Sequence, residues 1–192
     1  AALRATAFGN IHIMFPLVCT LLELRQAKMV LADVMEDLQE HHVPFNRDVP
    51  VGMMVETPAA AMMIDRFVEE VDFLSIGTND LVQYTLAVDR SNKDVVGLYN
   101  PADPSVLRLI AMSIQAADRK QLPISMCGQM SGSPLYTMLL LGMGLRRFSV
   151  TPSAIPEVKN ICRSVTLEDC KAVAERVMAM ENARDVRNYL KE

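Results

Sequence analysis

Polar side chains that could bind a ligand or transfer a proton stand directly after three short apolar runs. They are Glu56 after residues 50–55, Asn79 and Asp80 after 71–76, and Cys127 after 122–126. If the three runs are neighbouring strands of a parallel sheet, their carboxyl ends meet at one edge, where barrel enzymes place catalytic groups. The sequence therefore predicts one site built from these side chains.

Two of these side chains, Glu56 and Asp80, are carboxylates that would face the same space. They would repel one another unless a proton or a cation lies between them. Mg²⁺ is typically held by one or two carboxylates together with substrate oxygens, so a magnesium site is one interpretation. The other is that each carboxylate stabilises the start of a helix through the helix dipole. The spacing supports the two interpretations equally.

The segment 77–80, Gly-Thr-Asn-Asp, and Arg90 could bind an anion. A glycine followed by backbone N–H donors suits a phosphate or carboxylate, although any tight turn can have this composition. An arginine can form two parallel hydrogen bonds to the same kind of group. From the sequence alone, a surface ion pair of Arg90 with Asp89 or Asp94 is favoured.

Cys127 ends an apolar run and precedes a glycine, so its thiol could be a nucleophile or a proton donor. No histidine lies near it in the sequence to act as a base, and a buried structural cysteine is favoured from the sequence alone. Cys19, Cys162 and Cys170 are interpreted as small buried side chains. No cysteine or histidine cluster has the spacing of a zinc site.

The elements that must position these groups are short β-type runs alternating with helical patterns. The predicted strands are 11–15, 50–55, 71–76, 122–126 and 147–150. Helices are predicted over 21–41, from Thr57 to about 71, from Asp103 to about 117, from Ser133 to 141, and over 153–164 and 166–180. This alternation indicates an α/β fold with a parallel sheet, either a doubly wound sheet or a (β/α)₈ TIM barrel.

The polar groups at the strand ends favour the barrel, and no GxGxxG or P-loop sequence follows a strand. A barrel needs eight strands and about 250 residues. Five runs therefore predict the C-terminal part of a barrel, about five of its eight βα units, with the first three strands outside this sequence.

The composition of the 192 residues, 51% hydrophobic and 22% charged, is that of a globular protein. The net charge of −4 argues against a nucleic-acid partner. No apolar run approaches the roughly 20 residues of a membrane span, and the first residues lack a signal-peptide pattern. We therefore expect a cytoplasmic protein without membrane insertion.

Several longer segments occur in an order that is specific to one family. They are IMFP at 13–16, VGMMVETPAAA at 51–61, FLSIGTNDLVQYTLAVDR at 73–90, MCGQMSG at 126–132 and SAIPEVK at 153–159. Together they resemble the C-terminal half of phosphoenolpyruvate (PEP)–protein phosphotransferase, Enzyme I of the bacterial phosphotransferase system. PEP synthases and pyruvate phosphate dikinases share ETP, GTND and Cys-Gly but typically diverge after GTNDL. Asp89-Arg90 therefore indicates Enzyme I.

The resemblance implies that residues 1–192 are the C-terminal part of a PEP-binding TIM barrel, with a phosphohistidine domain and the first barrel strands outside the sequence. It also implies the residue roles. Glu56 and Asp80 would hold Mg²⁺, Asn79 and Asp80 would contact PEP, Arg90 would bind its phosphate, and Cys127 would donate a proton to the methylene carbon as pyruvate forms.

The function implied by the resemblance is Mg²⁺-dependent transfer of the phosphoryl group of PEP to an enzyme histidine and then to a small histidine phosphocarrier protein. Sugar uptake or its nitrogen-regulatory counterpart would use it, and a homodimer is expected. Gln129 departs from the family pattern, which usually has Glu there, and two phosphate-binding arginines belong to the strands outside the sequence. The isolated chain is therefore expected to be inactive. The alternatives are a dikinase or synthase relative and a non-catalytic dimerisation module.

Overall fold

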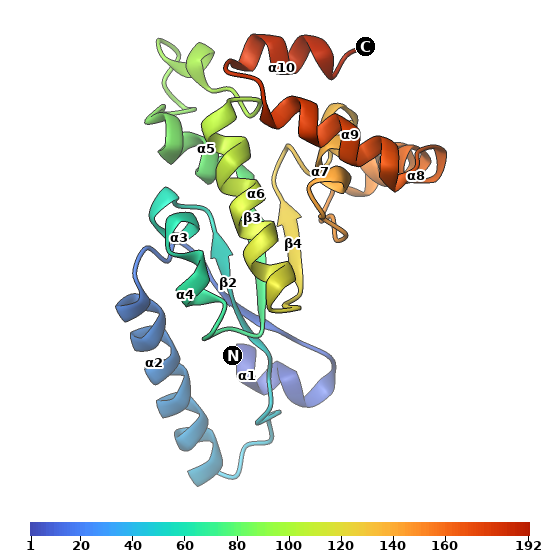
Figure 1. Ribbon diagram of the computed structural model, residues 1–192. Coiled ribbons are helices and arrows are strands. Elements are labelled where there is room, and N and C mark those ends of the chain that lie inside the picture. The colour runs from blue at the N-terminus through green and yellow to red at the C-terminus, as the bar shows by residue number, and fades with distance from the viewer.

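A four-stranded parallel sheet forms the centre of the protein in a computed structural model that describes all residues, 1–192. The strands are β1 (Ile13–Phe15), β2 (Val51–Val55), β3 (Phe73–Gly77) and β4 (Ile124–Cys127). They lie side by side in chain order, β1-β2-β3-β4 (Figure 1). The predicted α/β fold with a parallel sheet is confirmed, as are four of the five predicted strands.

The fifth predicted strand, 147–150, is wrong. Phe148 forms only an isolated parallel bridge with Met126. The backbone N–H of Met126 donates to Arg147 O at 3.0 Å, and the N–H of Ser149 donates to Met126 O at 2.8 Å. Pro152 then begins a 3₁₀ turn, Pro152–Ala154, which ends the pairing. The chain by itself thus forms an open sheet.

The register aligns the carboxyl ends of the strands. Val55 of β2 is paired with Ile76 of β3, and Gly77 of β3 is paired with Cys127 of β4. The residues at the carboxyl ends of β2, β3 and β4, and those that directly follow, therefore lie at the same edge of the sheet, as the sequence predicted.

The two faces of the sheet differ in character. One face is covered by the helices and carries five fully buried side chains, Met53, Val55, Leu74, Ile76 and Met126. The opposite face, which we call the site face, carries Met54, Phe73, Ser75, Ser125 and Cys127. Side chains alternate between faces along a strand, so the site face includes every second residue up to the carboxyl edge.

Ten helices accompany the sheet. They are α1 (Ala2–Ala5), α2 (Leu21–Glu40), α3 (Pro58–Met62), α4 (Ile64–Phe67), α5 (Thr78–Leu86), α6 (Pro104–Arg119), α7 (Pro134–Gly142), α8 (Ile155–Ser164), α9 (Leu167–Met178) and α10 (Ala183–Tyr189). Short 3₁₀ turns occur at Thr6–Phe8 and Val96–Leu98.

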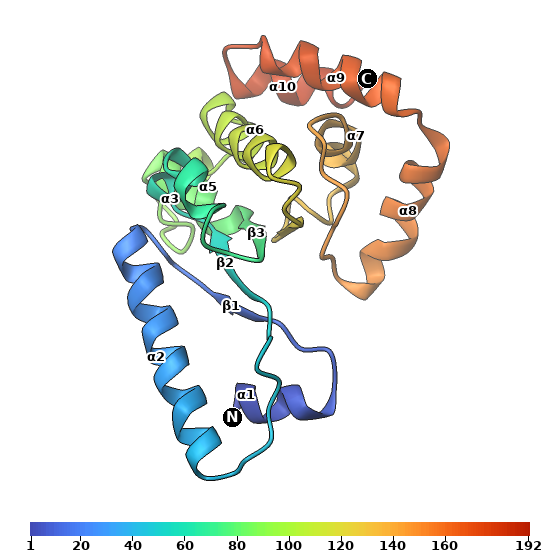
Figure 2. The same ribbon diagram turned by 60° about the horizontal axis from the view of Figure 1, so that its bottom comes forward.

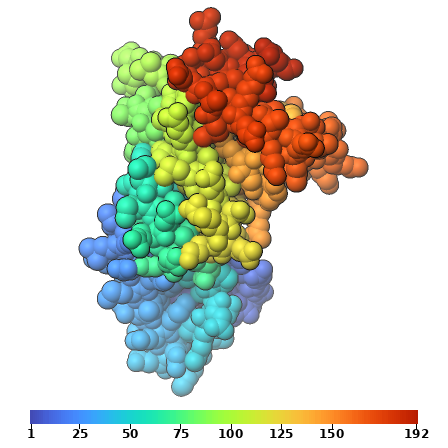
Figure 3. Space-filling model, viewed as in Figure 1, coloured from blue at the N-terminus to red at the C-terminus, as the bar shows by residue number.

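Helix α6 lies along β3 and β4 and packs against β3, α3, α4 and α5 (Figures 1 and 2). Helix α7 packs against α8 and α9. The N-terminal segment lies at one end of the molecule and the C-terminal helices lie at the other (Figure 3). No helix combines the length and apolar composition needed to cross a membrane.

Polar side chains begin several helices as the sequence predicted. The Thr57 hydroxyl accepts from Ala60 N–H at 3.2 Å, and Asp103 Oδ1 accepts from Ser105 N–H at 2.9 Å. Thr166 Oγ1 likewise accepts from Asp169 N–H at 3.1 Å. Ser133 is the N-cap residue of α7 and Pro134 begins the helix, as predicted, but the Ser133 side chain makes no capping hydrogen bond.

Other helical predictions need correction. The helix predicted from Thr57 divides at Met63 into α3 and α4. Helices α5 and α10 were not predicted. Of the three cysteines expected to be buried, only Cys170 is; Cys162 is exposed and Cys19 is half-buried.

Candidate active site

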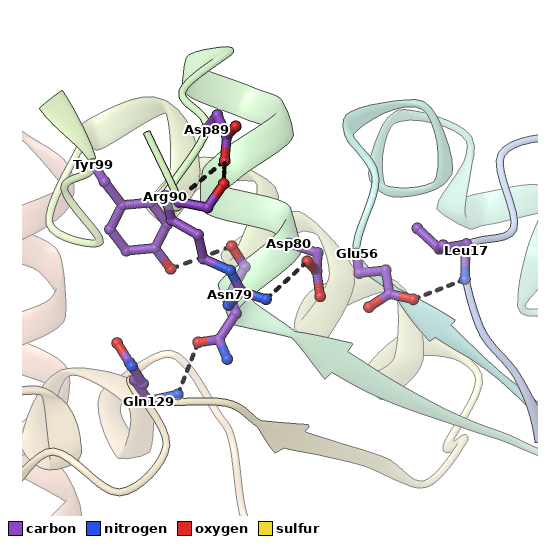
Figure 4. A network of polar contacts seen from close by, with 9 residues as sticks. Leu17, Glu56, Asn79, Asp80, Asp89, Arg90, Tyr99 and Gln129 are labelled. Carbon is purple, nitrogen blue, oxygen red and sulfur yellow. Dashed lines mark hydrogen bonds and ion pairs between the residues drawn. The ribbon is translucent and has the colours of Figure 1, made fainter. Parts of the chain in front are cut away.

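The structure brings the predicted site residues together at the carboxyl edge of the sheet. Glu56 directly follows β2, Asn79 and Asp80 lie in the first turn of α5 directly after β3, and Cys127 is the last residue of β4. Arg90 follows the end of α5 and turns back toward Asp80 (Figure 4).

Glu56 is a buried carboxylate, only 4% exposed. Its Oε1 accepts a hydrogen bond from the backbone N–H of Leu17 at 2.7 Å. Burial raises the pKa of Glu56, the Leu17 N–H lowers it, and the negative charge of Asp80 raises it again. A Cβ on Gly77 would lie only 2.7 Å from Glu56 Oε2, so a glycine at the end of β3 lets this carboxylate lie against the strand.

Asp80 and Arg90 form a loose ion pair. Arg90 Nη2 lies 3.5 Å from Asp80 Oδ1, and the two side chains are 44% and 35% exposed. Asp89 instead accepts from the backbone and hydroxyl of Ser91, so the predicted pairing of Arg90 with Asp89 or Asp94 is wrong. An exposed pair at this distance contributes little stability, which leaves both groups available to a ligand.

Asn79 is held from two sides (Figure 4). Its Oδ1 accepts the backbone N–H of Gln129 at 3.0 Å, and its backbone carbonyl accepts from the hydroxyl of Tyr99 at 3.2 Å. Because Oδ1 is occupied, the Nδ2 amide is the group of Asn79 that remains free to donate to a ligand. The sequence indicated Asn79 but not Tyr99, which is distant along the chain.

Gly128 makes the close approach of this loop possible. Its φ is +95°, and a Cβ there would collide with the hydroxyl of Thr78 and lie 3.0 Å from Asn79 Oδ1. Only glycine adopts such a φ without strain. The loop after β4 therefore packs directly on the first turn of α5.

The Cys127 thiol lies on the site face, half-buried. It donates to the carbonyl of Ile76 at 3.6 Å and accepts from the hydroxyl of Ser75 at 3.8 Å. Its backbone carbonyl accepts from Thr78 Oγ1 at 3.0 Å.

Two hollows lie at opposite edges of the sheet. Asn79, Cys127 and Gln129 line one of them, together with Ser149 and Thr151 from the segment after α7. The other hollow lies at the amino ends of the strands, away from Glu56 and Asp80. Its lining includes His12, Asp72 and Arg147. The first hollow is the one that a ligand of the thiol would enter.

The amino-acid sequence matches a known family. Residues 1–167 match the sequence profile described as PEP-utilising enzyme, PEP-binding domain. The chain belongs to this family.

Curated relatives of this PEP-binding domain chain include the PEP-protein phosphotransferases of Geobacillus stearothermophilus and Bacillus subtilis. The first is 44% identical over 191 residues, which are 100% of this chain and 33% of that protein. The second is 40% identical over 192 residues, 100% of this chain and 34% of that protein. The chain thus spans about a third of these relatives and is homologous to their C-terminal third.

A solved citrate lyase from Burkholderia xenovorans has a similar fold. Its TM-score is 0.58 at 18% identity, over 98% of this chain and 64% of that structure. At this identity the likeness concerns the fold alone.

The carboxylates of the PEP-binding domain suit an open Mg²⁺ site, completed by water and substrate, better than a metal site built from protein ligands alone. No group of three or more His, Cys, Asp or Glu side chains comes together. Mg²⁺ needs only one or two carboxylates, the remaining positions being filled by water and substrate phosphate. Glu56 and Asp80 meet that requirement, since Leu17 engages only Oε1 of Glu56.

Gln129, where Enzyme I usually has Glu, uses its backbone rather than its side chain in the site. Its N–H is bonded to Asn79, and the residue is exposed. An amide or a carboxylate at this exposed side chain therefore leaves the backbone contact with Asn79 in place.

Proposed function

We propose that this chain is the PEP-binding part of an Mg²⁺-dependent phosphotransferase of the Enzyme I type. The protein would bind PEP, pass its phosphoryl group to an enzyme histidine and release pyruvate. The observation that supports this most directly is the meeting of Glu56, Asp80 and Arg90 at one edge of the sheet. Two carboxylates and a guanidinium around one space suit a metal-bound phosphate better than a neutral ligand.

Each polar group has a binding role in this proposal. Arg90 holds the phosphate, and the free Nδ2 of Asn79 donates to an oxygen of PEP. Asp80, whose Oδ1 lies 3.5 Å from Arg90 Nη2, would be shared with the metal, so PEP would replace it as the partner of Arg90. Glu56 and Asp80 would hold Mg²⁺, which when bound neutralises negative charge on the transferring group and on the enolate.

Cys127 is the proposed proton donor. Loss of the phosphoryl group leaves the enolate of pyruvate, whose methylene carbon must gain a proton. The S–H bond of Cys127 breaks with its electron pair remaining on sulfur, and a C–H bond forms from the electron pair of the enolate. The thiolate then takes a proton from water. A thiol held at the rim of the hollow can deliver this proton from one side of the substrate.

The remaining parts of the machinery would come from outside this chain. The outer edge of β1 has no partner strand. We infer that further strands close the sheet there into a (β/α)₈ barrel and bring additional phosphate-binding arginines. The histidine acceptor, the small phosphocarrier protein, a homodimer and a cytoplasmic role in sugar uptake or nitrogen regulation belong to the same proposal.

Binding of PEP to the complete natural polypeptide tests the proposal. Isothermal titration calorimetry with MgCl₂ should show binding that is abolished by EDTA. Arg90→Ala should weaken it about tenfold or more, as expected for loss of a charge-assisted bond. Arg108→Ala, an exposed arginine on α6, is the matched control and should bind like the wild type. Binding that needs no Mg²⁺, or that is indifferent to Arg90, would contradict the proposal.

A further inference from the structure

Ser75 is a polar side chain buried in the middle of β3. It is 6% exposed, and its neighbours Leu74 and Ile76 are 1% and 0% exposed on the opposite face. Burying a hydroxyl is unfavourable unless it finds a hydrogen-bond partner. The nature of that partner therefore indicates what Ser75 does.

The partner of the Ser75 hydroxyl is the sulfur of Cys127, at 3.8 Å. Strand pairing explains the contact, because Gly77 is opposite Cys127 and Ser75 is opposite Ser125. Cys127 thus lies on the same face, one pleat nearer the carboxyl edge.

The polar surroundings of the sulfur are asymmetric between the thiol and thiolate forms. The carbonyl of Ile76 accepts the S–H proton at 3.6 Å, whereas Ser75 donates to the sulfur. When the thiol loses its proton, the Ile76 contact loses its hydrogen and becomes a contact between a carbonyl oxygen and an anion. The Ser75 hydroxyl can still donate to the sulfur and so stabilise the thiolate.

We propose that Ser75 is a positioning residue for Cys127. Its hydroxyl directs the sulfur toward the hollow and stabilises the thiolate that remains after Cys127 has given its proton to the substrate carbon. Ser75 itself exchanges no proton with the substrate. The inference rests on the proposed function for its place in turnover, but the effect on the sulfur can be measured without PEP.

The chain offers a matched control in Ser125. It occupies the neighbouring position on the same face, opposite Ser75. Its hydroxyl donates to the carbonyl of Leu74 at 3.4 Å and has no contact with the sulfur. Ser75→Ala and Ser125→Ala therefore make the same chemical change on the same face, and only the first removes a donor to Cys127.

The test is the rate of alkylation of Cys127 by iodoacetamide as a function of pH in the complete natural polypeptide. The thiolate is the reactive form. Trypsin releases residues 121–146 as one peptide in which Cys127 is the only cysteine, so mass spectrometry follows this site alone. Ser75→Ala should react about tenfold more slowly at neutral pH, with the alkylation profile displaced to higher pH. Ser125→Ala should follow the wild-type profile.

A second pair keeps the test valid if Ser75→Ala does not fold. Ser75→Thr and Ser75→Val have nearly the same shape, and only the threonine retains a hydroxyl. The threonine variant should react faster than the valine variant at neutral pH by a similar factor. Equal profiles in either pair, or the same displacement in Ser125→Ala, would overturn the proposal.

Turnover gives an independent reading. Ser75→Ala should lower kcat for pyruvate formation while KM for PEP stays unchanged, and Ser125→Ala should alter neither. If Cys127→Ala retained full turnover, the proton-donor role would fail while the alkylation result still decided the contact with Ser75. The two failures are thereby distinguishable.

Discussion

The backbone N–H of Leu17 donates to Oε1 of Glu56 at 2.7 Å, which ties the loop after β1 to the buried carboxylate after β2. Leu17 has a φ of 52°, in the left-handed region, and its side chain is 54% exposed. A residue with a Cβ pays roughly 1–2 kcal/mol for that conformation. The fold accepts this strain at the point where the loop supplies a donor to Glu56.

Relieving this strain should stabilise the protein. Leu17→Gly keeps the N–H donor, removes the Cβ and should raise the free energy of unfolding by about 1 kcal/mol. Leu17→Ala keeps the strain and loses little packing, so it should be near neutral. Urea denaturation followed by circular dichroism compares the three proteins. A glycine variant less stable than wild type would show that the exposed leucine has a packing role.

The pKa of Glu56 predicts how stability changes with pH in the absence of metal. Burial and Asp80 raise the folded-state pKa above its usual value, so the folded protein binds more protons than the unfolded chain in the intervening range. The contribution of Glu56 is therefore most favourable when it is protonated and is lost as pH rises through the raised pKa. Glu56→Gln should be more stable than wild type at pH 7 in EDTA, and the difference should shrink in acid.

Glu36→Gln controls for the loss of one charge, because Glu36 is exposed on α2. The free energy of unfolding of Glu36→Gln should follow that of the wild type from pH 4 to 8. Added MgCl₂ distinguishes the variants further. At about ten times its Kd it should stabilise the wild type by about 1.4 kcal/mol and leave Glu56→Gln unchanged. A parallel pH dependence in wild type and Glu56→Gln would exclude Glu56 as its source.

Gly128 should not tolerate a side chain. Gly128→Ala places a Cβ against Thr78 and Asn79 at a φ of +95° and should cost about 2 kcal/mol of stability or more. Gly97→Ala is the matched control, since nothing lies within 4 Å of a Cβ there. Thermal unfolding compares the two variants. Similar melting temperatures would mean that the loop after β4 moves freely away from α5.

Cys127→Ala should lower kcat for pyruvate formation by about 10²- to 10⁴-fold, the usual effect of removing a general acid. Binding of PEP should survive, because the proposed phosphate contacts are elsewhere. The exposed thiol of Cys162 provides the control, and Cys162→Ala should retain wild-type turnover. A coupled assay for pyruvate measures both. Wild-type kcat in Cys127→Ala would eliminate the thiol as the proton donor.

The grouping of the site at one edge could be predicted because parallel strands place their carboxyl ends together. Glu56 directly follows a strand and Cys127 ends one, so predicting the strands was enough to place both residues. Their positions depended on periodicity and length rather than on distant contacts. The same reasoning wrongly predicted a strand at 147–150. The residues there are of β type, but Pro152 follows too closely for a full strand to form.

Contacts between segments distant in sequence could not be predicted in this way. Helix α5 begins without a side-chain cap at Gly77, so the usual signal for a helix start was missing. Tyr99 donates a hydrogen bond to Asn79, 20 residues away in the sequence, and Ser75 donates one to Cys127, 52 residues away. Such pairs depend on strand register and loop path, which no local pattern contains.

The strands lie in the sheet in the order in which they occur in the chain. During synthesis, each strand that emerges from the ribosome can therefore pair with the strand made just before it. Glu56 and Asp80 can come together as soon as β2, β3 and the start of α5 have emerged, whereas Cys127 arrives only with β4. During synthesis the two carboxylates thus meet before the thiol joins them. Under the proposed function, the carboxylates that would hold Mg²⁺ are therefore in place before the proposed proton donor.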